Sequence, residues 1–129
     1  MPVDLDRYRI LIVEDERIIA YDIEFMLRDL GYKVVKVVST GEDAVTQALL
    51  LKPDLILMDI KLKGDKDGIE TAQRIRENLN VPIIFVSAYS DEATMKKLLY
   101  QSFDSYIAKP FGINQLSQKI NMILKDVSA

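Results

Sequence analysis

Asp59 follows an apolar run, residues 55–58, whose composition predicts a buried strand. A carboxylate at the end of such a strand is costly unless another group compensates its charge. Three other apolar runs also end in polar side chains, which are Glu14 and Asp15, Ser87, and Lys109. If the four runs are parallel neighbours in one sheet, the acids, the hydroxyl and the ammonium meet at one edge. Such a set of groups predicts a site for a phosphate and a metal ion.

Each of these residues also has a purely structural explanation. An aspartate such as Asp59 often caps a helix or lies in a solvated loop, and Glu14 and Asp15 could cap the helix that follows them. Ser87 could cap a turn, and Lys109 could be an ordinary surface lysine. Three carboxylates placed together would, however, repel one another, and each would resist ionising. A divalent cation relieves that repulsion, and Mg2+ usually takes one or two carboxylates together with water and phosphate oxygens.

The composition excludes several kinds of chemistry. The chain has no cysteine and no histidine, so disulfides, thiol nucleophiles, imidazole acid–base catalysis and His-ligated zinc are ruled out. Any metal must therefore be held by oxygen, which indicates magnesium, manganese or calcium. The net charge of −3 argues against broad attraction to nucleic acid or to anionic lipid. No run approaches about 18 apolar residues and the N-terminus has no apolar signal region, so we expect a cytoplasmic protein with no membrane contact.

Short apolar runs alternate with longer segments in which apolar residues recur at steps of three and four. The predicted strands cover residues 10–14, 34–38, 55–58, 83–87 and 105–108. The predicted helices cover residues 16–30, 40–51, 69–79, 92–101 and 112–126. This strict alternation predicts an α/β fold with a single doubly wound, five-stranded parallel sheet and helices on both faces. Ligands of such sheets bind beyond the carboxyl ends of the strands, where the polar groups named above lie.

Local signals refine this scheme. Lys36, in the middle of the second strand, predicts a position at the edge of the sheet. Gly31 predicts the end of the first helix, and Asp91 predicts an N-cap for the fourth. At 129 residues the chain has the length of one domain. We assign residues 9–126 to this domain, residues 1–8 to an N-terminal arm and residues 127–129 to a C-terminal tail.

Five short motifs occur in order and at suitable spacing along the chain. They are Ile-Val-Glu-Asp-Glu at 12–16, Leu-Met-Asp-Ile at 57–60, Asp-Gly-Ile-Glu at 67–70, Val-Ser-Ala at 86–88 and Ala-Lys-Pro-Phe at 108–111. Each motif alone is weak, but the combination resembles the receiver domain of response regulators in two-component signalling, the CheY-like superfamily. The resemblance covers about residues 8–126. It implies a flavodoxin-like sheet with the strand order 2-1-3-4-5.

The same resemblance implies roles for the residues at the strand ends. Asp59 would be the phosphoacceptor, attacking a phosphohistidine of a partner kinase to give an aspartyl phosphate. Asp15, Asp59 and the backbone carbonyl of Lys61 would bind Mg2+, or Mn2+ in its place, and Glu14 would act mostly through water. Between Asp59 and Asp67 the chain is one residue longer than the usual family pattern, and this difference falls in the loop that follows Lys61.

Three further residues have implied roles in switching. Lys109 would contact the phosphoryl oxygens beside a cis Lys109–Pro110 bond. Ser87 would turn its hydroxyl toward the phosphoryl group, and Tyr106 would swing inward behind it. These movements would switch the surface formed by the fourth helix, the fifth strand and the fifth helix. The chain would act on itself, by accepting the phosphoryl group and later losing it to water, and would not be an enzyme for other substrates.

The resemblance also implies partners. The expected partners are a histidine kinase or a phosphotransfer protein, an unknown downstream protein target, and a second copy of the chain bound through the switched surface. No direct contact with nucleic acid is expected. The chain would be a standalone regulator, or the receiver of a larger regulator or hybrid histidine kinase.

Two alternative functions would use the same fold. A phosphorylation-independent interaction module would usually lack one of the acids or the lysine, and here none is missing. A flavodoxin-like enzyme or cofactor protein would need a glycine-rich phosphate loop, and the sequence has neither G-x-G-x-x-G nor G-x-x-x-x-G-K-[ST]. The motifs therefore favour a receiver that is switched by phosphorylation.

Overall fold

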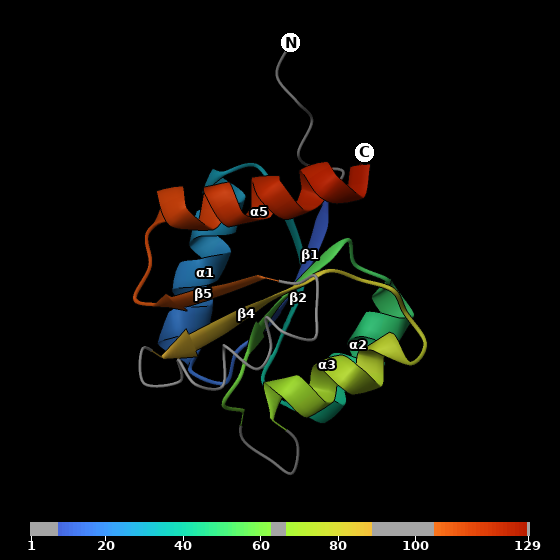
Figure 1. Cartoon of the computed structure of the whole chain (residues 1–129). Coiled ribbons are helices and arrows are strands. Elements are labelled where there is room, and N and C mark those ends of the chain that lie inside the picture. The colour runs from blue at the N-terminus through green and yellow to red at the C-terminus, as the bar shows by residue number, and fades with distance from the viewer. Residues whose placement is uncertain (1–7, 63–66, 89–104, 129) are drawn as a thin grey trace.

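The computed structural model describes residues 8–62, 67–88 and 105–128, and the five strands in these ranges form one parallel sheet (Figure 1). The strands are β1 (Arg9–Val13), β2 (Lys33–Val38), β3 (Leu55–Asp59), β4 (Ile83–Ala88) and β5 (Ser105–Lys109). Their order in the sheet is β2-β1-β3-β4-β5, which confirms the expected topology. Each strand begins and ends within one residue of its predicted bounds.

Two described helices cover each face of the sheet. α1 (Arg17–Asp29) and α5 (Ile113–Ser128) lie on one face, and α2 (Gly41–Leu51) and α3 (Gly68–Arg76) lie on the other (Figure 1). These helices match four of the five predicted ones. The remaining helix, predicted at 92–101 with Asp91 as its cap, lies outside the described residues. No helix among the described residues is long and apolar enough to cross a membrane.

Alternate residues of the central strands pack into two separate apolar cores. In β1, Ile10 and Ile12 join the core on the α1–α5 side, while Leu11 and Val13 join the core on the α2–α3 side. All four residues are at most 1% exposed, which explains why the central strands are continuous apolar runs. The last residue of a strand that is buried on both faces lies at the edge of the sheet, between the two layers of helices. Asp59 is that residue in β3.

β2 is an edge strand, as Lys36 predicted. Its register against β1 shifts between Ile10, which pairs with Val34, and Leu11, which pairs with Lys36. Val35 is therefore the extra residue of a bulge. An exposed lysine and a bulge on an edge strand both oppose pairing with a strand of another chain.

Local chemistry sets the end of α1 at the amino edge of the sheet and the starts of α2 and α3 at the functional edge. Gly31 ends α1 with φ of 99°, in the left-handed region that favours glycine. Thr40 caps α2, because its Oγ1 accepts a hydrogen bond from the Asp43 N–H at 3.1 Å. Asp67 caps α3 in the same way, because its Oδ1 accepts from the Glu70 N–H at 2.9 Å. The start of α3, just after the loop that follows β3, is therefore well defined.

Arg9 holds the amino end of the sheet. Its backbone N–H donates to Asp54 Oδ2 at 2.8 Å, and its guanidinium donates to the carbonyl oxygens of Leu51 at 2.6 Å and Lys52 at 3.4 Å. Leu51 ends α2, and Lys52 is its left-handed C-cap with φ of 49°. The guanidinium therefore satisfies carbonyls at the negative end of a helix dipole.

Candidate metal and phosphate site

Three carboxylates come together at the carboxyl ends of two neighbouring strands. Asp59 is the last residue of β3, and Glu14 and Asp15 directly follow β1, which pairs with β3. One carboxylate oxygen from each residue lies within 4.8 Å of the others. Glu14 and Asp59 are 3% and 5% exposed, whereas Asp15 is only partly buried. The acids therefore form a compact cluster that is open to solvent on the Asp15 side.

Lys109 brings the positive charge to this cluster from the far side of β4. Its Nζ lies 2.9 Å from Glu14 Oε1 and 3.5 Å from Asp59 Oδ2. Lys109 ends β5, whose register aligns it with Ala88 of β4, so the side chain must cross the end of β4 to reach the acids. The Lys109–Pro110 bond is cis, as the family resemblance implied.

The surroundings of Glu14 disfavour the charged form of its carboxyl group. Its pKa is raised to about 7, because burial and the neighbouring Asp59 together outweigh the lowering effects of Lys109 and of the Glu16 N–H. That N–H donates to Glu14 Oε2 at 3.1 Å. Glu14 Oε1 is buried and has no hydrogen bond within the described residues. The ion pair with Lys109 is the interaction there that compensates the charge on this oxygen. Glu14 therefore holds charge that the protein itself compensates incompletely.

The two acids that contact Lys109 favour the charged form of its ammonium. Burial lowers its pKa, but the contacts with Glu14 and Asp59 together outweigh burial and raise the pKa above its ordinary value. Lys109 therefore stays charged at neutral pH. Its ammonium pairs with two of the three carboxylates, Glu14 and Asp59.

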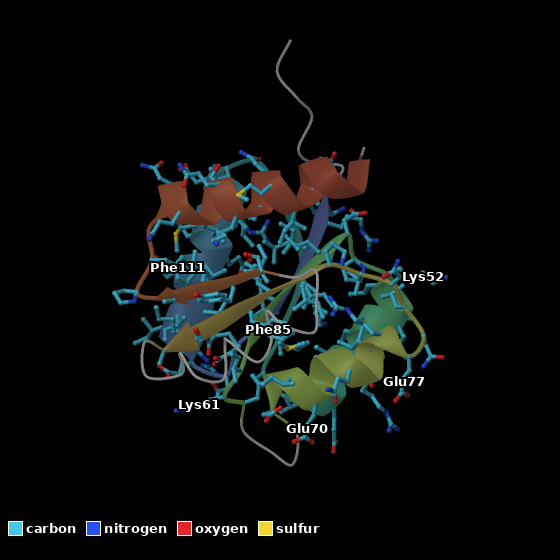
Figure 2. The ribbon with its side chains drawn as sticks, viewed as in Figure 1. Lys52, Lys61, Glu70, Glu77, Phe85 and Phe111 are labelled. Atoms are coloured by element: carbon cyan, nitrogen blue, oxygen red, sulfur yellow. The ribbon has the colours of Figure 1, made fainter. Side chains whose placement is uncertain are left out.

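The remaining predicted site residues lie on β4, on β5 or just after β3. Ser87 is 2% exposed and lies near the end of β4, one residue beyond Val86, the partner of Asp59 in the sheet. Lys61 follows β3 by two residues and lies at the carboxyl end of the strands, on the side away from Lys52 (Figure 2). Tyr106 is half-buried on β5 and packs against the core on the α2–α3 side. Ser87 and Lys61 thus lie beside the acids, and Tyr106 lies three residues before Lys109.

Gly68 is a site residue whose role was not predicted. It begins α3, and its N–H donates to the Ile60 carbonyl at 2.7 Å. A Cβ at this position would overlap the backbone carbonyl of Asp59 and press against Ile60 Cα. Only glycine lets the first turn of α3 approach the backbone of the phosphate-site strand so closely. The sequence signal was present in the Asp-Gly-Ile-Glu motif, but spacing alone did not reveal this contact.

A cleft of about 450 Å3 gives access to the acids from the β2 edge. Its walls include Glu14 and Asp15, the first turn of α1 at Arg17, and Lys36 of β2. Asp15 therefore lies between this cleft and the buried Asp59.

The donor set fits a hard divalent cation. All three groups are carboxylates, one acid is buried without a hydrogen bond to one of its oxygens within the described residues, and the Lys109 ammonium pairs with two of the three. Mg2+ prefers oxygen ligands and retains water, which suits a cluster that is partly open to solvent. The family resemblance implies that Asp15, Asp59 and the carbonyl of Lys61 would hold it.

Comparison with known proteins gives the family. A sequence profile described as the response regulator receiver domain matches residues 10–121. The chain belongs to this family. This receiver is 37% identical over 114 residues to the transcriptional regulatory protein PdtaR of Mycobacterium tuberculosis, a match that covers 88% of this chain and 55% of PdtaR. The chain thus spans about half the length of the curated relatives it matches.

Solved structures of receivers share the fold. The signal receiver domain of a modulated diguanylate cyclase from Desulfovibrio desulfuricans is 39% identical, with a TM-score of 0.82 over 94% of this chain and 98% of that one. The receiver domain of a Pseudomonas aeruginosa sensor histidine kinase is 36% identical, with a TM-score of 0.79 over 89% and 95% of the two chains. That structure has a magnesium ion coordinated in the active site cleft. Receiver domains bind Mg2+ at an acidic site and interact with histidine kinases or phosphotransfer proteins.

Proposed function

We propose that Asp59 accepts a phosphoryl group from a phosphohistidine of a partner protein. The observation that carries this proposal is the placement of a buried carboxylate within 3.5 Å of a fixed ammonium and within reach of two further acids. This arrangement supplies a nucleophile, a cation for the phosphoryl oxygens and ligands for a metal.

The chemical step is a displacement at phosphorus. An Asp59 carboxylate oxygen attacks, the bond between phosphorus and the imidazole nitrogen breaks, and the imidazole leaves with the electron pair. Bound Mg2+ would neutralise charge on the phosphoryl oxygens, and Mn2+ could replace it. Lys109 contacts one phosphoryl oxygen and Ser87 donates its hydroxyl to another. Later attack by water on phosphorus restores Asp59 and releases phosphate.

Lys109 changes partner during this cycle. Its ammonium lies closer to Glu14 than to Asp59, at 2.9 Å against 3.5 Å. A cation held by Asp15 and Asp59 would compensate Glu14 through water and release Lys109 toward the phosphoryl group. Binding at the acids that follow β1 and end β3 therefore changes the contacts of a lysine on β5.

The output is a change at β5, α5 and the helix predicted at 92–101. A phosphoryl group adds about two negative charges and three acceptor oxygens beside Ser87 and Lys109. Tyr106, three residues before Lys109 on β5, follows Ser87 inward. A complete switch, from about 1:99 to 99:1, requires about 5.5 kcal/mol of differential stabilisation. A downstream protein, or a second copy of the chain, would bind the switched surface.

The exposed face of α1 is suited to a protein donor. Ile18, Tyr21 and Phe25 are 85%, 66% and 70% exposed and recur at steps of three and four along α1. α1 begins two residues after Asp15, so a partner that delivers phosphate to the acids also covers this stripe. Three large apolar side chains exposed on one helix favour a protein contact.

Labelling with a small phosphodonor tests the phosphoacceptor. Acetyl phosphate should modify the wild type only when Mg2+ is present, and Asp59→Asn should abolish the modification. Asp29→Asn removes an exposed carboxylate of α1 and should label normally. Mass spectrometry after acid quenching locates the group. A phosphoryl group on any other residue would refute the assignment, and labelling without a divalent cation would refute the role of the metal.

Substitution on α1 tests the docking face. Phe25→Ser should slow transfer from a phosphorylated histidine kinase while leaving labelling by acetyl phosphate unchanged. Leu50→Ser is the matched control, because Leu50 is also 70% exposed but lies on α2, which covers the other face of the sheet. Equal transfer rates in the two variants would place the donor elsewhere.

A further inference from the structure

A lysine of α5 lies over the ring of Tyr106. Lys119 Nζ is 5.8 Å from the centroid of that ring, within the range of a cation–π contact. α5 covers the α1–α5 face of the sheet, whereas Tyr106 packs against the core on the opposite face. β5 is the last strand of the described order, so the lysine side chain reaches the ring around the edge of the sheet. This contact links α5 to the strand that carries Lys109.

The ring of Tyr106 has contacts of two kinds, with the core on the α2–α3 side and with Lys119 of α5. Tyr106 is only half-buried, and its partner on the adjacent strand β4 is Phe85, which is 3% exposed. Ser87 lies two residues further along β4 and is 2% exposed. A ring that moved inward behind Ser87 would leave the partly exposed position beside Lys119. The cation–π contact therefore belongs to the outer position of the ring.

We propose that Lys119 is a positioning residue that stabilises the outer position of Tyr106 and thereby opposes the phosphorylation-linked change. This inference rests on the proposed function, because it requires that phosphorylation of Asp59 and the inward movement of Tyr106 be coupled. A ligand that favours the inner position must then overcome the contact. By linkage, loss of the contact strengthens binding of that ligand by the same factor. A partly exposed cation–π contact corresponds to a factor of about 2–5.

Binding of a phosphoryl mimic measures this factor. Beryllium fluoride with Mg2+ should bind Lys119→Gln about 2–5 times more tightly than the wild type. Lys33→Gln removes the same charge from an exposed position on β2, at the far edge of the sheet, and should bind as the wild type does. Lys119→Arg keeps a cation that can lie over the ring and should restore wild-type affinity.

A double-mutant cycle separates the ring contact from a general effect of charge. In a Tyr106→Leu background, Lys119→Gln should change the affinity no further, because the ring is gone. The ring proton shifts of Tyr106, recorded by NMR without the mimic, should also change in Lys119→Gln and not in Lys33→Gln. Thermal melting of each variant confirms that it is folded.

Each outcome bears on a distinct claim. Unchanged affinity in a folded Lys119→Gln variant would overturn the inference, and so would an equal gain in the Tyr106→Leu background, which would indicate charge alone. Failure of the wild type to bind the mimic with Mg2+ would instead overturn the proposed function. A gain in Lys119→Gln that Tyr106→Leu removes supports the inference.

Discussion

The two ends of the sheet treat their charged groups in opposite ways. At the amino end, Arg9 donates hydrogen bonds to Asp54 and to the last carbonyls of α2, at distances from 2.6 to 3.4 Å. At the carboxyl end, three carboxylates lie together, the Lys109 ammonium pairs with two of them, and Glu14 keeps a buried oxygen without a hydrogen bond in the described part of the chain. The first arrangement compensates its charges, and the second does not.

The difference shows what each end contributes. A guanidinium that satisfies helix carbonyls stabilises the fold and gains nothing from a ligand. Glu14, whose pKa is raised by burial and by Asp59, is retained at the expense of stability, and the acidic cluster gains when a cation arrives. Charge compensation and ligand binding are therefore concentrated at opposite ends of the same strands. Three predictions test this division, from the largest expected effect to the smallest.

Gly68→Ala should cause the largest loss. Its Cβ would collide with the backbone of Asp59 and Ile60, so we expect a loss of about 3 kcal/mol in the free energy of unfolding, together with weaker Mg2+ binding. Urea titration and Mg2+ titration by calorimetry measure the two effects. Gly112→Ala is the control, because its Cβ would meet no atom within 4 Å, and it should cost less than about 1 kcal/mol. Equal losses in the two variants would contradict the close approach of Gly68 to the backbone of Asp59.

Arg9→Ala should destabilise the fold without touching the site. The carbonyls of Leu51 and Lys52 lose a charged donor, so we expect a loss of about 2 kcal/mol in the free energy of unfolding. Affinity for Mg2+ should stay at the wild-type value. Lys33→Ala, an exposed neighbour on the edge strand, should change stability by less than about 0.5 kcal/mol. Weakened Mg2+ binding in Arg9→Ala would show that the two ends are coupled.

Mg2+ should stabilise the wild type by a smaller amount. At ten times its dissociation constant, a ligand that binds only the folded state adds about 1.4 kcal/mol to the free energy of unfolding. Asp15→Asn should reduce this gain, and Arg9→Ala should keep it in full. Thermal melts at rising Mg2+ concentration give the comparison. A gain that Asp15→Asn leaves intact would place the metal elsewhere.

Much of the fold could be predicted because the strands are buried on both faces. Leu55 to Met58 are at most 1% exposed, and such continuous burial requires the apolar run from which β3 was predicted. Lys36 indicated the edge strand, and the same burial indicated that Asp59 needed compensation. Parallel topology then brought Asp59 to the same edge as Glu14, Asp15 and Lys109.

The contacts within the site could not be predicted from spacing. Lys109 crosses the end of β4, so its preference for Glu14 over Asp59 depends on the reach of a side chain. The close approach of Gly68 depends on how α3 packs against β3, and the position of Lys119 depends on the path of α5 past the sheet edge. The hydrophobic pattern specifies which face of an element is buried, and it leaves these distances open.

The two apolar cores have a consequence for the growing chain during translation. The buried residues of the core on the α2–α3 side all lie between Leu11 and Phe85, whereas the core on the α1–α5 side also needs Leu116 and Leu124. One half of the domain can therefore assemble on the ribosome while the other waits for the last helix. Lys109 belongs to the late half, so a nascent polypeptide carries its acids before it carries their counter-charge.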